Sequence, residues 1–156
     1  KVTCVFPQGA LAGCAPVFIG YTAISKDVDL TLLFLCQLIT IWIPLHVWSL
    51  MISHRDDYKQ AGIKYFPISL EVKDSVKILP VLAVLLFAAS IALYYEGNFD
   101  LIYLLTACIM GILTVLSTVR LIYGKLSSAS WKIYKLTAFP YLGILFLAMV
   151  LDKWLL

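Results

Sequence analysis

Charged residues are scarce in this sequence. Asp, Glu, Lys and Arg together make up 13% of the 156 residues, whereas hydrophobic residues make up 62%. A soluble domain is usually about one quarter charged, so this composition excludes an ordinary soluble enzyme or binding module. The chain also has no low-complexity segment, no polar linker and no internal repeat that would divide it. We therefore expect a single membrane domain over residues 1–156.

Features of cysteine chemistry are also lacking. The sequence has four cysteines, all within apolar runs: Cys4, Cys14, Cys36 and Cys108. None forms a CxxC pair, and none has a neighbouring ligand set of the zinc type. The sequence therefore shows no sign of a thiol redox centre or a structural zinc site, and we interpret the cysteines as small apolar filling residues.

Long apolar runs are the main feature that the chain does have. A membrane-spanning helix needs roughly 20 apolar residues, and a backbone in lipid must satisfy its own hydrogen bonds, which favours helices. The sequence predicts five such helices, near residues 2–24, 30–53, 78–95, 101–121 and 133–152. We expect an all-α integral membrane protein whose longest connection, residues 54–77, contains the polar stretch HRDDYKQAGIKYFP.

Lysine and arginine are distributed unevenly among the connections. Ten of the twelve fall on one predicted side of the membrane, at residue 1, within 54–77 and within 120–135, while Lys26 and Lys153 fall on the other. Because cytoplasmic loops are enriched in these cations, we expect a multi-pass protein of the cell (plasma) membrane with the 54–77 connection in the cytoplasm and the C-terminus outside. The net charge of +3 follows from this asymmetry, so it implies no nucleic-acid partner.

Polar and aromatic side chains recur at helical spacing towards the end of the second predicted span. The recurring residues are Trp42, His46, Ser49, Ser53 and then Asp56 or Asp57. If the helix continues into the 54–77 connection, they form one stripe from a carboxylate at the water edge to an imidazole inside the bundle. Ionisable groups within a membrane are costly and by default suggest function. The alternative is a structural histidine bonded to a neighbouring helix, with serines that ease packing.

The adjacent carboxylates Asp56 and Asp57 are candidate metal ligands. Hard oxygen ligands at a membrane edge suit Mg²⁺, which takes one or two carboxylates together with phosphate oxygens of a substrate. Arg55 and Lys59 supply cations that could bind a phosphate. The alternative is a solvated loop whose charges pair with one another, and the residues alone favour this alternative.

Three motifs resemble those of the protoheme IX farnesyltransferases, also called haem O synthases, a branch of the UbiA-type intramembrane prenyltransferases. In chain order they are GALAGCAPVFIGY at 9–21, WIPLHVW at 42–48 and DDYKQAG at 56–62. The closing YLGILFLAMVLDKWL at 141–155 is similar to the last helix of that family. The resemblance covers the whole chain but only the C-terminal half of a family member.

The resemblance implies a nine-helix bundle of which this chain holds the last five helices, with a first acidic motif in the N-terminal half outside this chain. It also implies Mg²⁺-assisted transfer of a farnesyl group from farnesyl diphosphate to a vinyl group of haem b, which gives haem O. Asp56 and Asp57 would then be the catalytic, metal-binding residues. The substrate-binding residues would be Arg55, Lys59, Tyr58, His46, Trp42, Ser49 and Ser53. His46 would contact haem or ligate its iron, and the chain without its N-terminal half would be inactive.

Two other classes of function remain open. One is a UbiA-type prenyltransferase with a quinone or lipid acceptor, against which the DYxxAG motif and the Trp/Pro/His segment argue. The other is a non-catalytic membrane or transport subunit. A transporter concentrates polar groups near the bilayer midplane in broken helices, whereas the densest polar chemistry here lies at the predicted membrane edge.

Overall fold

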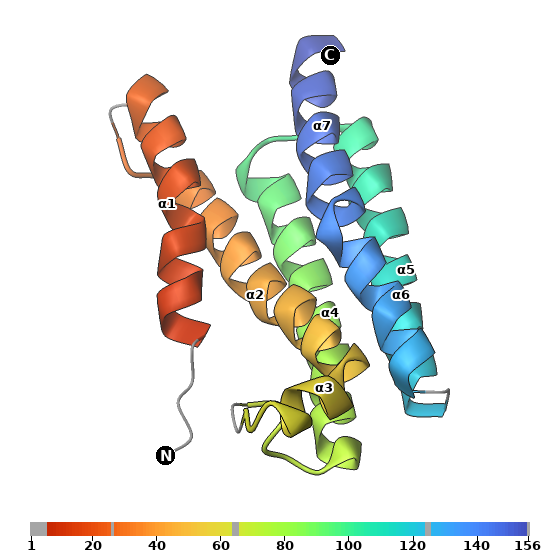
Figure 1. Ribbon diagram of the computed structural model, residues 1–156. Helices are drawn as coiled ribbons and strands as arrows, with labels where there is room; N and C mark the ends of the chain where they lie inside the picture. Colours follow the sequence, from red (N-terminus) through yellow and green to blue (C-terminus); the bar gives the residue numbers. More distant parts are fainter. Residues whose placement is uncertain (1–5, 26, 64–65, 124–125, 156) are drawn as a thin grey trace.

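The computed structural model describes residues 6–25, 27–63, 66–123 and 126–155, and these residues contain helices but no strand. The all-α prediction is thereby confirmed for the described part of the chain. The helices are α1 (Phe6–Ile24), α2 (Leu30–Ser53), α3 (Arg55–Gln60), α4 (Val72–Glu96), α5 (Leu101–Tyr123), α6 (Leu126–Ala138) and α7 (Pro140–Leu155), shown in Figure 1.

Four helical segments are long and apolar enough to cross a membrane: Leu30–Ser53, Val72–Glu96, Leu101–Tyr123 and Ala129–Leu155. Within α1 the apolar stretch is the shorter Ala12–Ile24. These segments confirm the class of an integral membrane protein. The fifth span and the nine-helix bundle remain predictions.

Two helix boundaries differ from the ranges that hydropathy suggested. α4 begins at Val72 rather than near residue 78. Its first turns are polar, so hydropathy detects only the apolar part of the helix. The last predicted span, 133–152, consists of two helices, α6 and α7, that meet at Phe139. Pro140 lacks an N–H group and its ring obstructs the preceding turn, so α6 does not continue regularly through it.

The long helices alternate in direction, so their connections gather at two ends of the bundle (Figure 1). α3 lies at one end, together with the start of α1, the end of α5 and the start of α6. The α1–α2 and α4–α5 connections and the end of α7 lie at the other end. The chain therefore places the two cation-rich connections on the same side, as the predicted topology requires.

Small residues allow α1 to approach α2 closely. A Cβ atom added to Gly13 would lie 2.4 Å from Ile43 Cδ1 and 3.3 Å from Ile39 Cγ2, and one added to Gly9 would lie 3.9 Å from Ile43 Cγ2. Gly9 and Gly13 have the GxxxG spacing that brings helix backbones together in membranes. Within the described residues, α2 is the one helix that α1 contacts.

A buried polar network joins α4, α5 and α7. The Tyr103 hydroxyl donates to the Ser90 carbonyl at 2.9 Å, and Ser90 Oγ donates to the Leu86 carbonyl at 3.0 Å. Tyr141 Oη lies 3.0 Å from Ser90 Oγ. Because Ser90 uses its one proton on Leu86, Tyr141 is the donor to Ser90. Ser90, Tyr103 and Tyr141 are all 0% exposed, so the network is enclosed by the three helices.

Asp152 on α7 caps the start of α5. Its carboxylate accepts the backbone N–H of Asp100 and, at 3.0 Å, that of Tyr103. The first N–H groups of a helix have no partner within the helix, and a side-chain acceptor stabilises them. Asp152 is therefore a buried tertiary contact, and α7 continues past it to Leu155.

Candidate functional site

The chain turns between α2 and α3. α2 ends at Ser53, and His54 has φ −111° and ψ 28°, outside the helical conformation. α3 lies across the end of α2 (Figure 1). The predicted stripe from Trp42 to Asp57 required one continuous helix, so that part of the prediction is wrong. The break gives α3 a direction of its own at this end of the bundle.

Asp56 and Asp57 lie in the first turn of α3, and both are exposed. Among the described residues the one ion pair joins Lys77 to Asp74 at 3.3 Å. The two carboxylates therefore pair with neither Arg55 nor Lys59, and their exposure agrees with a solvated loop as well as with a ligand site. Their oxygens are accessible to a ligand.

Arg55 is buried, with 6% of its surface exposed. Its guanidinium donates to the carbonyls of Ile68, at 3.2 Å, and of Leu70. It also donates to Ser75 Oγ at 3.3 Å. Ser75 in turn donates to the Pro67 carbonyl or to that of Glu71, each 2.9 Å away. Arg55 therefore holds the loop after α3 against the start of α4.

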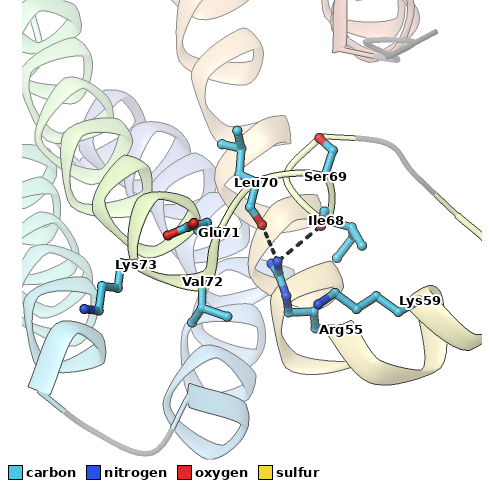
Figure 2. Close-up of a pocket in the computed structure, with 8 residues that line it drawn as sticks. All are labelled: Arg55, Lys59, Ile68, Ser69, Leu70, Glu71, Val72 and Lys73. Carbon is cyan, nitrogen blue, oxygen red and sulfur yellow. Dashed lines mark hydrogen bonds between the residues drawn. The ribbon is translucent and has the colours of Figure 1, made fainter.

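A pocket of about 510 Å³ lies beside this loop. Its lining residues are Arg55, Lys59, Ile68, Ser69, Leu70, Glu71, Val72 and Lys73, and Figure 2 shows the Arg55 guanidinium directed at the loop carbonyls. Asp56 and Asp57 do not line it. The structure thus brings the cations Arg55 and Lys59 to one pocket and leaves the two carboxylates outside it. Within the 54–77 connection, Lys64 and Tyr65 lie outside the described residues.

The candidate acceptor-binding residue His46 is held in an aromatic stack. Its ring is stacked on Trp42 with centroids 4.9 Å apart and an interplanar angle of 9°. Tyr134 of α6 is also stacked on the His46 ring, with centroids 4.7 Å apart and an interplanar angle of 26°. Because Trp42 is already stacked on it, no flat ligand fits between His46 and Trp42.

Both of these α2 side chains contact Thr137 of α6 through a ring nitrogen. Trp42 Nε1 donates to the Thr137 carbonyl at 2.7 Å, and His46 Nδ1 lies 3.3 Å from Thr137 Oγ1. The stack continues through Trp131, whose ring is 5.0 Å from Tyr134 and 5.5 Å from His54 at the end of α2. The α2–α6 interface is therefore aromatic from Trp42 to the α3 turn.

The remaining predicted site residues have local partners. Ser49 is fully buried and donates to the His46 carbonyl at 2.8 Å, and Ser53 donates to the Leu50 carbonyl at 2.7 Å. Trp48 packs edge-on against Phe66 with centroids 4.4 Å apart. Tyr58 is half-buried on α3. Ser49 and Ser53 therefore satisfy their hydroxyls within α2.

The carboxylates form part of a possible metal site. No group of three or more His, Cys, Asp or Glu side chains is close enough to hold a metal within the described residues. Asp56 and Asp57 alone fit Mg²⁺, since this ion keeps several waters and takes one or two carboxylates plus substrate phosphates. They would hold it only together with a substrate or with residues of another segment.

Comparison with known proteins relates the sequence to one family. The model of the UbiA prenyltransferase family matches residues 7–150. The chain belongs to the UbiA prenyltransferase family. It is 31% identical over 147 residues to a protoheme IX farnesyltransferase of Desulforudis audaxviator. The matched region covers 94% of this chain and 46% of that protein. It is 35% identical over 144 residues to protoheme IX farnesyltransferase 1 of Cenarchaeum symbiosum, covering 92% and 48%.

This UbiA-family chain spans about half the length of the curated relatives it matches. A third relative, a protoheme IX farnesyltransferase of Sulfurisphaera tokodaii, is 33% identical over 93% of this chain and 47% of its own length. No solved structure matches. The resemblance drawn from the three sequence motifs is thus confirmed.

Sequence reasoning missed Thr137 and Tyr134. Both lie on α6 of this UbiA-family chain, and both contact His46. The available signal was a threonine three residues before Pro140 within an apolar segment. Pairing it with His46 required knowing that α2 and α6 are neighbours, which no local pattern shows.

Proposed function

We propose that this chain is part of a prenyltransferase that transfers a farnesyl group from farnesyl diphosphate to a vinyl group of haem b, giving haem O. The observation that carries the proposal is the pair of exposed carboxylates, Asp56 and Asp57, on α3 beside a cation-lined pocket. The relatives' names, protoheme IX farnesyltransferase, support both the farnesyl donor and the haem acceptor.

In the proposed reaction the C–O bond of the farnesyl diphosphate breaks and its electron pair leaves with the diphosphate. The vinyl group of haem b supplies the electron pair of the new C–C bond, and water then adds to the cation left on the former vinyl carbon, with release of a proton, to give haem O. Lys59 is the cation that we assign to the diphosphate, because it lies on α3 with the two carboxylates and lines the pocket without an ion-pair partner among the described residues. Arg55 adds positive charge nearby while its hydrogen bonds hold the loop. Magnesium at Asp56 and Asp57 would supply further positive charge for the departing oxygens. The apolar bundle excludes water from the allylic cation.

His46 is the residue that we assign to the haem acceptor. It lies on α2, on the membrane side of the α3 carboxylates, with its ring edge available between Trp42 and Tyr134. An imidazole nitrogen is a common axial ligand of haem iron. Trp42 acts by supporting His46 rather than by forming a slot for the haem plane.

A complete site requires a first acidic motif, which we assign to an N-terminal half like that of the longer relatives. The 156-residue chain alone is then inactive. Formation of haem O by the purified chain would contradict this.

We also propose that α3 and its loop face the cytoplasm in the cell membrane, because most cations lie at this end. Cysteines introduced at the exposed positions Asn98 and Gln60 test the topology. The first is expected to react with a membrane-impermeant thiol reagent added outside cells, and the second is not. The reverse pattern would overturn the orientation.

The experiment that tests the function is an assay of the full-length protein with haem b and with a quinone precursor as acceptors. Asp57→Ala should lower the rate with haem b by roughly 10²-fold or more, the scale seen when an electrostatic stabiliser of a transition state is removed. Asp74→Ala is the matched control, because Asp74 is an exposed carboxylate near the same end that pairs with Lys77. Its rate should stay within about twofold, the scale of a weak surface ion pair.

Three outcomes would contradict the proposal. Prenylation of the quinone precursor and not of haem b would indicate the alternative acceptor class. Absence of Mg²⁺-dependent binding of farnesyl diphosphate would indicate a non-catalytic membrane subunit. Equal losses in Asp57→Ala and Asp74→Ala would remove the special role of the α3 carboxylate.

A further inference from the structure

The Thr137 hydroxyl can act only as a hydrogen-bond acceptor towards His46. Thr137 Oγ1 lies 2.8 Å from the Ile133 carbonyl oxygen and 3.2 Å from that of Tyr134. A carbonyl oxygen accepts and never donates, and a hydroxyl has one proton. That proton is therefore used within α6. Towards His46 Nδ1, 3.3 Å away, Thr137 Oγ1 acts as the acceptor.

The direction of this bond determines the tautomer of His46. If Thr137 accepts, His46 Nδ1 carries the proton, and in a neutral imidazole the other nitrogen, Nε2, is then unprotonated. Nε2 has no hydrogen-bond partner among the residues that the structure describes. Within the part of the chain that the structure describes, its lone pair is therefore unused.

The aromatic stack keeps the ring in this orientation. The rings of Trp42 and Tyr134 are stacked on His46 with centroid distances of 4.9 and 4.7 Å. The Trp42 indole can only donate its N–H, and it donates to the carbonyl of the same Thr137. Two parallel rings thus direct their N–H groups at one residue, so a flip of His46 would lose its hydrogen bond.

We propose that Thr137 is a positioning residue that fixes His46 as the Nδ1–H tautomer and presents the Nε2 lone pair to the iron of haem b. This rests on the proposed function for its ligand. Histidines that bind metals almost always donate their second ring N–H to an acceptor, and that acceptor sets the tautomer and orientation. Thr137 supplies this acceptor from a neighbouring helix.

The first test measures the tautomer directly. The full-length protein, labelled with ¹⁵N-histidine and free of haem, is studied by NMR at a pH where His46 is neutral, and His46→Gln identifies its signals. The expected result is a proton on Nδ1 and none on Nε2. Thr137→Val, which keeps the side-chain shape but removes the acceptor, should lose this preference. Thr137→Ser should retain it.

The second test measures haem b affinity by absorption titration of the same variants. Thr137→Val should weaken binding by about 10- to 100-fold, the usual effect of removing the hydrogen-bond partner of a ligating histidine, and Thr137→Ser should restore it. Thr114→Val is the matched control, because Thr114 is equally buried and donates only to the Met110 carbonyl of its own helix, at 2.8 Å. Mg²⁺-dependent binding of farnesyl diphosphate should be unchanged in all three, which verifies their folding.

The outcomes separate this inference from the function on which it rests. An Nε2–H tautomer in the wild type, or unchanged tautomer and haem affinity in Thr137→Val, would overturn the role of Thr137. Equal haem losses in Thr137→Val and Thr114→Val would also overturn it. If the wild type binds no haem but shows an Nδ1–H tautomer that Thr137→Val abolishes, the haem acceptor is wrong and the positioning of His46 by Thr137 stands.

Discussion

Two interfaces of this bundle bury polar side chains, and they differ in how completely those side chains are satisfied. Between α4, α5 and α7, the hydroxyls of Ser90, Tyr103 and Tyr141 are fully buried and bonded to one another or to backbone carbonyls. Between α2 and α6, His46 is half-buried and uses one ring nitrogen on Thr137. The first network, which we call the closed network, uses every hydroxyl proton, whereas His46 Nε2 in the second has no partner among the described residues.

This difference refines how polar residues in membrane spans are interpreted. Such residues are costly in lipid, and function is their usual explanation. The closed network shows that a polar cluster can instead join helices, because every hydroxyl proton has an acceptor there. We infer that a ring nitrogen without a hydrogen-bond partner among the described residues, rather than polarity, separates His46 from the structural residues.

The largest effect that we expect at the interface of α4, α5 and α7 is at Asp152. Asp152→Ala removes the acceptor of two backbone N–H groups at the start of α5. The loss should lower the free energy of unfolding by about 2 kcal/mol, the scale of an unsatisfied buried donor or a lost cap. Unfolding of the full-length protein in mixed detergent micelles measures it. Asp152→Asn keeps one acceptor oxygen and should lose less, and equal losses would contradict the capping role.

A smaller effect is expected at Trp42, whose indole N–H is bonded to Thr137 across the α2–α6 interface. Trp42→Phe removes the indole N–H bond to Thr137 but keeps an aromatic face for His46. Unfolding should become easier by about 1 kcal/mol, the typical net value of a hydrogen bond. Haem affinity should change by less than about threefold, because the His46–Thr137 bond remains. This is well below the tenfold change that corresponds to about 1.4 kcal/mol. A much larger haem loss would mean that Trp42 contacts the acceptor itself.

The smallest effect is expected for Tyr141→Phe, which deletes one donor to Ser90. Interhelical hydrogen bonds in membranes average about 0.6 kcal/mol, and Ser90 keeps its bond to Leu86. The same unfolding assay should show a loss of this size, with haem and diphosphate binding unaltered. Altered haem binding would mean that the interface of α4, α5 and α7 also contributes to haem binding, which would contradict the difference that we infer between the two interfaces.

Hydropathy located the apolar helices because an unbroken apolar run is required wherever a helix meets lipid. It did not show that α4 begins at Val72, since the first turns of that helix are polar. Pro140 was visible in the sequence, but the helix break at Phe139 was not predicted because the apolar composition continues across it.

The candidate site was predicted only in part. The motif resemblance predicts that Asp56, Asp57 and His46 belong to one family site, and this stays a prediction. The buried role of Arg55 and the contact between His46 and Thr137 depend on which helices are neighbours. That information is tertiary, so no pattern within one segment contains it.

The most direct test of the contrast between the interfaces is a haem b titration of His46→Ala and wild-type full-length protein, with farnesyl diphosphate binding measured on the same samples. Our account predicts weaker haem binding or a changed haem absorption spectrum in His46→Ala, while Mg²⁺-dependent diphosphate binding persists. Normal haem affinity with an unchanged spectrum would contradict it, and His46 would then be a structural residue like Ser90 and Tyr141.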